Sequence, residues 1–388
     1  MKTKENFTQG LEKEIGQCIR CGFCQAVCPV YETTFRPAHS ARGRMLLLKE
    51  VMEGTIPPLK ELADPFYNCT TCQACTYSCP AQIKVAQVVE GTRKKLYEAG
   101  YTPAPLLGMK DNILKTGNVF AGAREKRIEL YPPRLKEKAQ KGELKARAGT
   151  LLFMGCVPSY GDLKIVPSLV ETLEDGVVDY TTLAMEEVCC GFPLYLMGAG
   201  EFEIHGKKII QQIQATGAGE LVTPCAGCYK TFTQLYPKIG DLGLKVYHSV
   251  QYLDRLIGEG RIQLKGQGPR TVTYQDPCDL GRSLGIFEEP RNILKNVPDF
   301  ILVEMTRNRL QARCCGGGGG LQADNPEAAH QMAARRVKDA LAVGAELLVC
   351  ACAACKNNLK KGARLLPKGE RNRIKIVDIT EVAAEAMA

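Results

Sequence analysis

The sequence predicts an α+β multidomain protein, in which a mostly helical N-terminal domain precedes two α/β units that each contain a small parallel sheet. Two observations carry this prediction. The 19 cysteines fall into separate groups, eight within the first 79 residues and eleven from Cys156 onwards. The later group repeats one cysteine pattern twice, with alternating strand and helix segments between the cysteines. We expect domains at 1–100, 149–262 and 263–388, with a basic connector at 101–148.

The composition excludes several classes of protein. The chain has 388 residues, of which 45% are hydrophobic and 24% charged, as in globular proteins with more than one domain. No apolar run approaches the ~18 residues of a membrane-spanning helix, and the N-terminal residues lack the apolar segment of an export signal. We therefore expect a cytoplasmic protein, in which this many cysteines indicates metal binding and not disulfides.

Two N-terminal motifs have the spacing of bacterial ferredoxins. Each reads C-x2-C-x2-C-x3-C-P, beginning at Cys18 and at Cys69. In such runs three thiolates bind one [4Fe–4S] cluster and the fourth binds the other. The predicted ligands are Cys18, Cys21, Cys24 and Cys79 for one cubane cluster, and Cys69, Cys72, Cys75 and Cys28 for the second. The alternative is a zinc-binding interaction protein without a redox role, but structural zinc sites use pairs of C-x2-C.

Two helices are expected beside these motifs, at 41–52 and 83–99. The first contains Arg42-Gly43-Arg44 followed by an apolar stretch and closes at Gly54. The second has helical periodicity. With the cysteine motifs, these features resemble the helical dicluster ferredoxin domain of succinate dehydrogenase and heterodisulfide reductase iron–sulfur subunits.

The connector holds most of the net charge of +9, because the stretch from Gly91 to Thr150 contains 14 Lys and Arg against 6 Asp and Glu. Prolines interrupt it and prevent one long helix. A solvated, partly helical linker is the favoured interpretation, and a docking surface for an acidic partner subunit is the alternative. Nucleic acid is not expected as a partner, because no aromatic residues are interleaved with the basic ones.

The C-terminal region repeats a five-cysteine pattern, in which a single cysteine is followed by Cys-Cys-Gly and then by C-x2-C. The two copies are Cys156, Cys189, Cys190, Cys225 and Cys228, and Cys278, Cys314, Cys315, Cys352 and Cys355. Adjacent thiolates can reach two different irons, and the following glycine lets the backbone approach a metal closely. In the second copy the five glycines 316–320 can offer bare N–H groups to sulfide, or form a flexible loop.

Strands are expected at 150–154, 177–182, 220–223 and 245–248 in the first unit, and at 270–275, 300–305, 346–349 and 374–377 in the second. With helices between them, each set forms a parallel sheet. The cysteines then follow the strands, where open α/β sheets bind ligands. The remaining cysteine, Cys350, is interpreted as a small buried apolar residue.

Ferredoxin motifs followed by two complete five-cysteine patterns resemble the D-type subunit of heterodisulfide reductase and its bacterial relatives, in which the pattern is called the CCG domain. The resemblance covers all of the chain except the connector. It implies a noncubane [4Fe–4S] cluster on the five cysteines of each complete copy, and so one or two such clusters here. It also implies an oxidoreductase subunit in which one such cluster, or a facing pair, splits a disulfide in one-electron steps.

Two functional hypotheses follow for a cytosolic, oxygen-sensitive redox complex. In the first, electrons pass through the cubane clusters to the noncubane clusters, which reduce a small disulfide. In the second, the chain only relays electrons, and the substrate site lies on another subunit of a flavin dehydrogenase for glycolate, glycerol 3-phosphate or lactate, or of an aromatic acyl-CoA reductase complex.

Both hypotheses require other redox subunits as partners, such as a flavoprotein, a ferredoxin-type subunit or a substrate-reducing subunit. Contact with a membrane is expected only through a partner. No Gly-x-Gly-x-x-Gly motif opens a helix after a strand, so we expect no flavin or nicotinamide on this chain.

A few polar residues near the motifs have open roles. Lys230, Arg282 and Lys356 follow cysteine motifs and are candidates for binding an anionic substrate, although solvated surface charge is the favoured interpretation. His205 and His330 each lie 15 residues after a Cys-Cys pair, which predicts a shared packing or hydrogen-bonding role and not metal ligation. The sequence identifies no catalytic residue apart from the clusters themselves.

Overall fold

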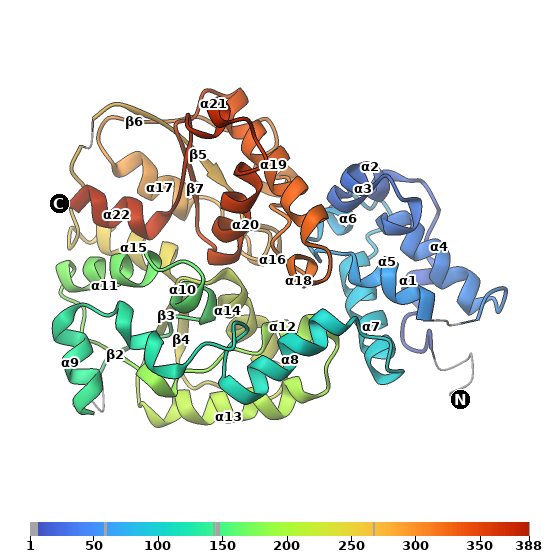
Figure 1. Cartoon of the computed structure of the whole chain (residues 1–388), viewed down its shortest axis with the longest axis horizontal. Coiled ribbons are helices and arrows are strands. Elements are labelled where there is room, and N and C mark those ends of the chain that lie inside the picture. The colour runs from blue at the N-terminus through green and yellow to red at the C-terminus, as the bar shows by residue number, and fades with distance from the viewer. Residues whose placement is uncertain (1–6, 58–59, 143, 145–147, 267, 388) are drawn as a thin grey trace.

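The computed structural model describes residues 7–57, 60–142, 144, 148–266 and 268–387. A helical domain lies at one end of the molecule, and two α/β units lie one above the other beside it (Figure 1). The predicted α+β multidomain class is confirmed. The N-terminal residues 1–6, which entered the expectation about an export signal, lie outside the described residues.

The N-terminal domain consists of short helices because the cysteine loops interrupt the chain. Helix α4 has the predicted bounds, and it begins after Ser40, whose hydroxyl accepts a hydrogen bond from the Gly43 amide at 2.8 Å and so caps the helix. Helix α7 is slightly shorter than predicted. The helices are α1 (Glu12–Gly16), α2 (Phe23–Ala26), α3 (Pro29–Thr34), α4 (Ala41–Met52), α5 (Ala63–Tyr67), α6 (Ala74–Tyr77) and α7 (Val85–Glu98).

The basic segment that follows is a packed layer. It contains α8 (Ala104–Thr116), the 3-10 helix η4 (Arg124–Leu130) and α9 (Pro133–Lys141). Leu106 and Ile113 of α8 are 1% exposed. Arg127 of η4 forms a buried ion pair with Glu187, which also accepts hydrogen bonds from the amides of Met154 and Gly155 at 2.8 and 2.9 Å. The described part of this segment is therefore not a wholly solvated linker.

Each α/β unit contains a four-stranded parallel sheet, and the strand order is the same in both: β2-β1-β3-β4 and β6-β5-β7-β8. In the first sheet Leu151 pairs with Thr181 on one side and Leu221 on the other. The direction of winding reverses between β1 and β3, and likewise between β5 and β7. Such a reversal is the topological switch point, at whose carboxyl edge open α/β sheets bind ligands.

The first unit contains β1 (Thr150–Leu152), α10 (Cys156–Tyr160), α11 (Ile165–Asp175), β2 (Tyr180–Thr182), α12 (Phe192–Met197), α13 (Glu201–Ala215), β3 (Glu220–Thr223), α14 (Ala226–Lys230), the π-helix η6 (Thr231–Leu235), β4 (Lys245–His248) and α15 (Ser249–Gly258). The second contains β5 (Arg270–Gln275), α16 (Gly281–Leu284), α17 (Glu289–Asn296), β6 (Phe300–Leu302), α18 (Leu321–Asp324), α19 (Pro326–Ala342), β7 (Leu347–Cys350), α20 (Ala353–Ala363), α21 (Lys368–Arg371), β8 (Lys375–Asp378) and α22 (Ile379–Met387).

Strands β3, β4 and β5 have the predicted bounds, β7 and β8 begin and end one residue later, and β1, β2 and β6 are shorter. Strand β1 ends early because Glu187 binds the amides of Met154 and Gly155 and draws them out of the sheet. Strand β2 starts late because Val177 has a left-handed φ of 50°, which an extended strand cannot contain.

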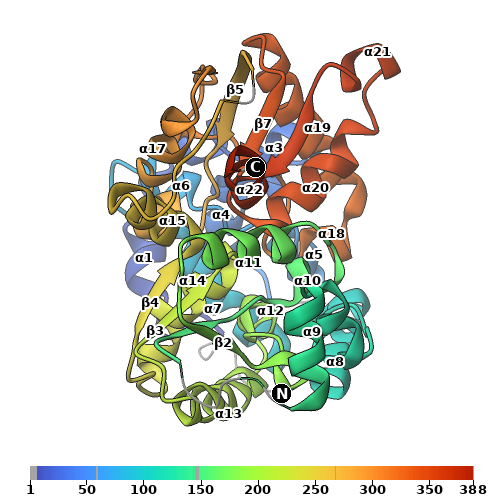
Figure 2. The same cartoon turned by 90° about the vertical axis from the view of Figure 1, so that its left-hand side faces the viewer.

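The two units share one packed interface. Figure 2 shows the second unit above the first, with α22 lying beside α11. Lys356 of the second unit pairs with Asp162 of the first at 2.7 Å and also with Glu381. Apolar side chains from both units belong to one hydrophobic core.

One buried arginine joins all three parts of the molecule. Arg93 of α7 is 0% exposed and donates five hydrogen bonds to carbonyl oxygens. Two of these carbonyls are in α5, one is in the loop at Cys69 (2.6 Å), one belongs to Leu196 of the first unit (2.9 Å) and one to Gly319 of the second (2.9 Å). The helical domain is thus attached to both α/β units at one point.

The prediction of solvated surface charge for Lys230, Arg282 and Lys356 is wrong. These side chains are 4%, 3% and 0% exposed. Lys230 pairs with Asp279 across the unit boundary at 2.9 Å, and Arg282 donates to the Cys72 carbonyl at 3.0 Å. Each of the three holds parts of the protein together, and their polar groups already have partners within it.

None of the helices in the described ranges combines the length and apolar character that are needed to cross a bilayer.

The buried pair between Arg127 and Glu187 predicts a stability effect. Arg127→Met leaves the Glu187 carboxylate buried without its cation, so we expect the free energy of unfolding to fall by about 3 kcal/mol. Arg124→Met is the matched control, because Arg124 lies in the same 3-10 helix with its side chain 47% exposed, and we expect it to cost under about 1 kcal/mol. Urea unfolding measures both. Equal losses for the two variants would contradict a structural role for Arg127.

Candidate metal centres

The first three cysteines of the first ferredoxin motif lie together with the last cysteine of the second motif. Cys18, Cys21, Cys24 and Cys79 line one small cavity. Burial, and then repulsion from the thiolates of the other three, raise the pKa of Cys24 to about 11. A crowded set of thiolates in a poorly solvated cavity needs a cationic partner, and iron supplies one. The residues therefore fit an iron–sulfur cluster.

The other four cysteines of these motifs also lie together. Burial, followed by the neighbouring thiolates of Cys72, Cys69 and Cys28, raises the pKa of Cys75. The buried guanidinium of Arg44 lies beside this group. Burial opposes its charge, but the thiolates of Cys69 and Cys28 prevail and raise the pKa of Arg44. Arg44 thus supplies positive charge to the second cysteine set.

Left-handed residues curl both ferredoxin loops at equivalent positions. Arg20 and Gly22 have φ of 59° and 88° in the first loop, and Thr71 and Gln73 have φ of 51° and 64° in the second. For a residue with a side chain such a conformation costs about 1–3 kcal/mol and persists only where the surroundings impose it. Three of the four positions are not glycine, so their conformation could not be read from residue type.

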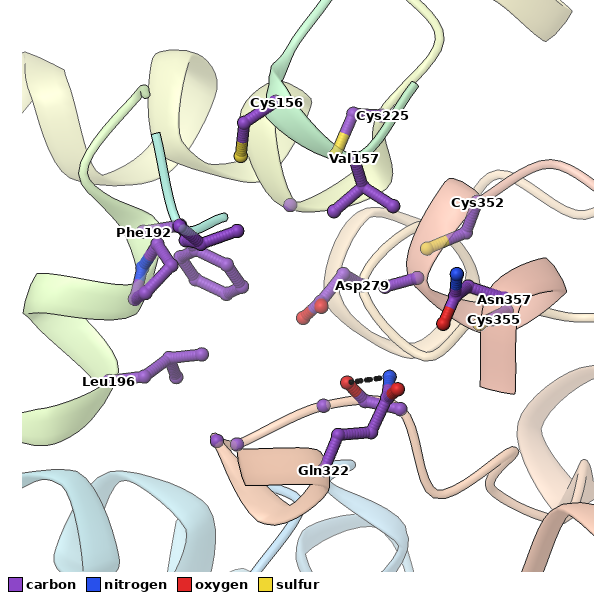
Figure 3. A pocket seen from close by; sticks show the side chains of 18 of the residues that line it. Cys156, Val157, Phe192, Leu196, Cys225, Asp279, Gln322, Cys352, Cys355 and Asn357 are labelled. Carbon is purple, nitrogen blue, oxygen red and sulfur yellow. Dashed lines mark hydrogen bonds between the residues drawn. The ribbon is translucent and has the colours of Figure 1, made fainter. Parts of the chain in front are cut away.

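The two α/β units enclose a cavity of about 300 Å³ (Figure 3). Side chains from both units face it: Cys156 and Cys225 lie on one side, and Cys352 and Cys355 on another. Nine of the ten cysteines of the five-cysteine patterns line this cavity, namely Cys156, Cys189, Cys190, Cys225, Cys228, Cys278, Cys315, Cys352 and Cys355.

The switch points of the two sheets place these cysteines. Cys156 follows β1 and Cys225 follows β3, which are the two strands at the reversal of the first sheet. Cys278 and Cys352 follow the corresponding strands β5 and β7 of the second sheet. The carboxyl edges of the two sheets therefore deliver their cysteines to one shared space.

The rest of the cavity wall is largely apolar. Helices α8 and α12 contribute Leu106, Phe192 and Leu196, and Figure 3 shows the latter two on the side away from Cys352. The charged side chains that line the cavity have partners within the protein: Asp279 pairs with Lys230, and Lys361 donates a hydrogen bond to Gln322 at 3.3 Å. Apolar walls of this kind exclude water and strengthen the electrostatic effect of the thiolates.

The glycine of each Cys-Cys-Gly sequence has a left-handed backbone. Gly191 and Gly316 both have φ of 79°. A Cβ at Gly316 would lie 2.5 Å from the Ala329 carbonyl oxygen, so only glycine fits there. Directly after the second pair, the amides of Gly316 and Gly317 donate to the thiols of Cys314 and Cys315 at 3.4 Å. Such N–H donors stabilise thiolate sulfur.

The other glycines of the run have a different function. A Cβ at Gly319 would lie 2.1 Å from the Cys69 carbonyl oxygen, and one at Gly318 would lie 2.9 Å from that of Thr70. The bare backbone of the run is therefore a docking surface for the second ferredoxin loop, and not a flexible loop.

The tenth cysteine of these patterns, Cys314, lies at this docking surface. A hydrogen bond with Cys314 is the main cause that lowers the pKa of Cys72. Both side chains belong to one small buried cluster with Val30 and Leu321. The second ferredoxin set and the second five-cysteine set are therefore in direct contact.

The shared hydrogen-bonding role that the sequence predicts for His205 and His330, as an alternative to a packing role, is wrong. His205 Nε2 donates to the Cys189 carbonyl at 2.6 Å. In the second unit the buried Nε2 of His330 has no hydrogen-bond partner among the residues described. Asn358 donates to the Cys315 carbonyl at 2.6 Å, which corresponds to the bond from Tyr236 to the Cys190 carbonyl at 2.9 Å in the first unit. Cys350 is fully buried in the core, as the sequence predicts.

Within the described ranges, no three His, Cys, Asp or Glu side chains lie close enough together to hold a single metal ion.

Two family models match the chain. The 4Fe-4S dicluster domain matches residues 14–83, and the cysteine-rich CCG domain matches twice, at 150–233 and 272–360. These matches indicate [4Fe–4S] clusters and an electron-transfer role of the oxidoreductase type.

The chain is also similar to known proteins over almost its whole length. The D-type subunit of the dihydromethanophenazine:CoB–CoM heterodisulfide reductase of Methanosarcina acetivorans is 30% identical, over 99% of this chain and 96% of that protein. The probable iron-sulfur-binding oxidoreductase FadF of Bacillus subtilis is 27% identical, over 99% and 61%. The EtfAB:quinone oxidoreductase of Syntrophomonas wolfei is 25% identical, over 96% and 58%. The similarity to the reductase subunit extends across almost the whole of both proteins, and both domain types are present. This chain therefore belongs to the family of heterodisulfide reductase D-type subunits.

Proposed function

We propose that this chain is an electron-transfer subunit that passes electrons through two cubane [4Fe–4S] clusters to noncubane [4Fe–4S] clusters in its CCG domains, where a small disulfide is reduced. The observation that carries the proposal is the single cavity lined by nine cysteines from both CCG domains. A disulfide takes up two electrons and two protons to give two thiols, so a site shared by two one-electron centres suits the reaction.

The proposed ligands are the eighteen cysteines that the sequence analysis assigned to four sets. The juxtaposition of Cys24 with Cys18, Cys21 and Cys79 supports the exchange of the fourth cysteine between the two ferredoxin motifs. Bound at these positions, the clusters supply electrons one at a time and soft iron with affinity for thiolate sulfur.

The protein itself supplies charge, orientation and exclusion of water. Arg44 places a buried cation beside the second ferredoxin set. Arg282 holds the Cys72 carbonyl at 3.0 Å and so orients the loop that contacts Cys314. The amides of Gly316 and Gly317 donate to thiol sulfur, and Phe192 shields the cavity.

The contacts also support an order for the four sites. The first ferredoxin set has its own cavity, the second set touches the second CCG domain through Cys72 and Cys314, and the first CCG domain meets the second across the shared cavity. We propose that electrons enter at the first ferredoxin set, from a flavoprotein or ferredoxin-type partner subunit, and that this chain binds no flavin or nicotinamide.

A relay role without substrate chemistry is the second candidate. It is favoured by the similarity to the EtfAB:quinone oxidoreductase, of which this chain spans 58%. In that case another subunit holds the substrate site.

Cysteine variants test the exchange of ligands between the motifs. Anaerobically reconstituted protein is expected to contain about sixteen irons, four in each of four clusters. Cys79→Ala should change the same magnetic resonance signal as Cys18→Ala, and Cys28→Ala the same signal as Cys75→Ala. If Cys79→Ala instead matches Cys75→Ala, each motif keeps its own fourth cysteine and the proposed sets are wrong.

Disulfide turnover tests the proposed reaction. The chemically reduced chain should reduce a small disulfide, and the double variant Cys189→Ser with Cys190→Ser should lose about 100-fold in rate because it removes two ligands at the cavity. Cys350→Ala is the control, since this cysteine is buried in the core and does not line the cavity, and it should retain the rate. Transfer to a dye without disulfide reduction by the unmodified chain would favour the relay role.

Gly319→Ala tests the contact between the ferredoxin loop and the second CCG domain. Its Cβ cannot fit beside the Cys69 carbonyl, so the two surfaces should separate and slow electron transfer between them by about 100-fold. Gly285→Ala is the matched control, because Gly285 also has a left-handed φ, of 75°, but open space around it. Stopped-flow reduction of the CCG-domain clusters measures the rate. Equal slowing in both variants would show backbone strain and not the contact to be responsible.

A further inference from the structure

A second pocket, strongly basic, lies on the second CCG domain and shares no lining residue with the cysteine cavity. Its volume is about 480 Å³, and it is bordered by the end of α20, by α21, by the edge strand β8 and by the start of α11 in the first CCG domain. Five basic side chains line it, from Lys164, Lys360, Arg364, Arg371 and Lys375.

Two of these five basic side chains are paired with carboxylates within the protein. The acidic residue of the pocket wall, Glu381, is 4% exposed and holds the buried Lys356. Lys360 pairs with Asp162 at 2.9 Å, and Lys375 with Glu385 at 3.1 Å. Lys164, Arg364 and Arg371 form no ion pair with any described residue. These exposed cations, from the residue before α11, the residue after α20 and the end of α21, therefore border one pocket without a counter-charge.

Helix electrostatics explain only part of this arrangement. Lys360 and Lys361 lie in the last turn of α20, where basic residues favour the negative end of the helix dipole. Arg371 likewise lies in the last turn of the short helix α21. Lys164 precedes the N-terminus of α11, so this effect does not account for it. The position of Lys164 beside Arg364 and Arg371 at one pocket instead points to an anion that the protein itself does not supply.

We propose that this pocket binds a small anion with two or more phosphate groups. Arginine presents a planar fork of donors that matches phosphate oxygens, and each phosphate ester carries about −1.5 to −2 charge at neutral pH. Two such groups match the three free cations. The pocket has the size of small-molecule sites, roughly 300–1,000 Å³.

The test is isothermal titration of the full, anaerobically prepared chain with inorganic tripolyphosphate at constant ionic strength. The double variant Arg364→Gln with Arg371→Gln should weaken binding by at least about tenfold, because it removes both guanidinium forks. The matched control is Lys368→Gln with Arg373→Gln. It removes the same charge from the same segment, at exposed positions that do not line the pocket, and should weaken binding less than about twofold.

Three outcomes would overturn the proposal. Equal weakening in the two double variants would mean that tripolyphosphate responds only to net charge. Heat no greater than that of a matched chloride titration would mean that no site exists. A polyglutamate peptide that binds more tightly than tripolyphosphate, with the same loss in Arg364→Gln with Arg371→Gln, would assign the pocket to an acidic protein segment. Unchanged circular dichroism and iron content in both variants establish that they are folded.

Discussion

The architecture depends on one buried cation, Arg93, whose five hydrogen bonds end on backbone carbonyls of the helical domain and of both CCG domains. Hydrogen bonds from a charged donor each contribute about 1.5–3 kcal/mol to stability, and a buried carbonyl that loses its donor is left without a partner, which is destabilising. Because the partners are backbone atoms, Arg93 fixes the course of the chain at Cys69, Leu196 and Gly319. Those three segments carry, respectively, the second ferredoxin loop, a wall of the cysteine cavity and the glycine run, so the relative positions of the proposed centres follow from this single side chain.

Around that point, the two CCG domains reach the same geometry by different interactions. Both have the same strand order and a left-handed glycine after the paired cysteines. In the first domain His205 and Tyr236 bind the carbonyls of Cys189 and Cys190, whereas in the second Asn358 binds the carbonyl of Cys315. The sheet topology places the cysteines at the switch point, and the supporting hydrogen bonds can then vary. The second domain also differs in its contacts, because its glycine run packs against the second ferredoxin loop.

Local patterns allowed the sequence to predict the domain types, the fold class and most strands. Cysteine spacing along a loop restricts which thiols can meet, and alternating apolar segments define a parallel sheet. The sequence could not predict partners that are distant in the chain: the burial of Lys230, Arg282 and Lys356 depends on residues 49 to 210 positions away. It could not predict the left-handed Arg20, Thr71 and Gln73 either, because tertiary packing imposes that conformation on residues that do not prefer it. The packing of the basic segment rests on Arg127, which looks like any surface arginine until Glu187 lies beside it.

The approach of Gly318 and Gly319 to the backbone of Cys69 and Thr70 has a mechanical consequence. Where two surfaces meet through side chains, rotamer changes let the gap widen or narrow at little cost. Here main chain meets main chain, so no rotamer adjustment is available and the spacing is set by covalent geometry and van der Waals radii. The junction is stiff in compression, and thermal motion can alter it only by displacing whole domains. Tunnelling rates that depend steeply on distance would then be nearly uniform from one molecule to the next.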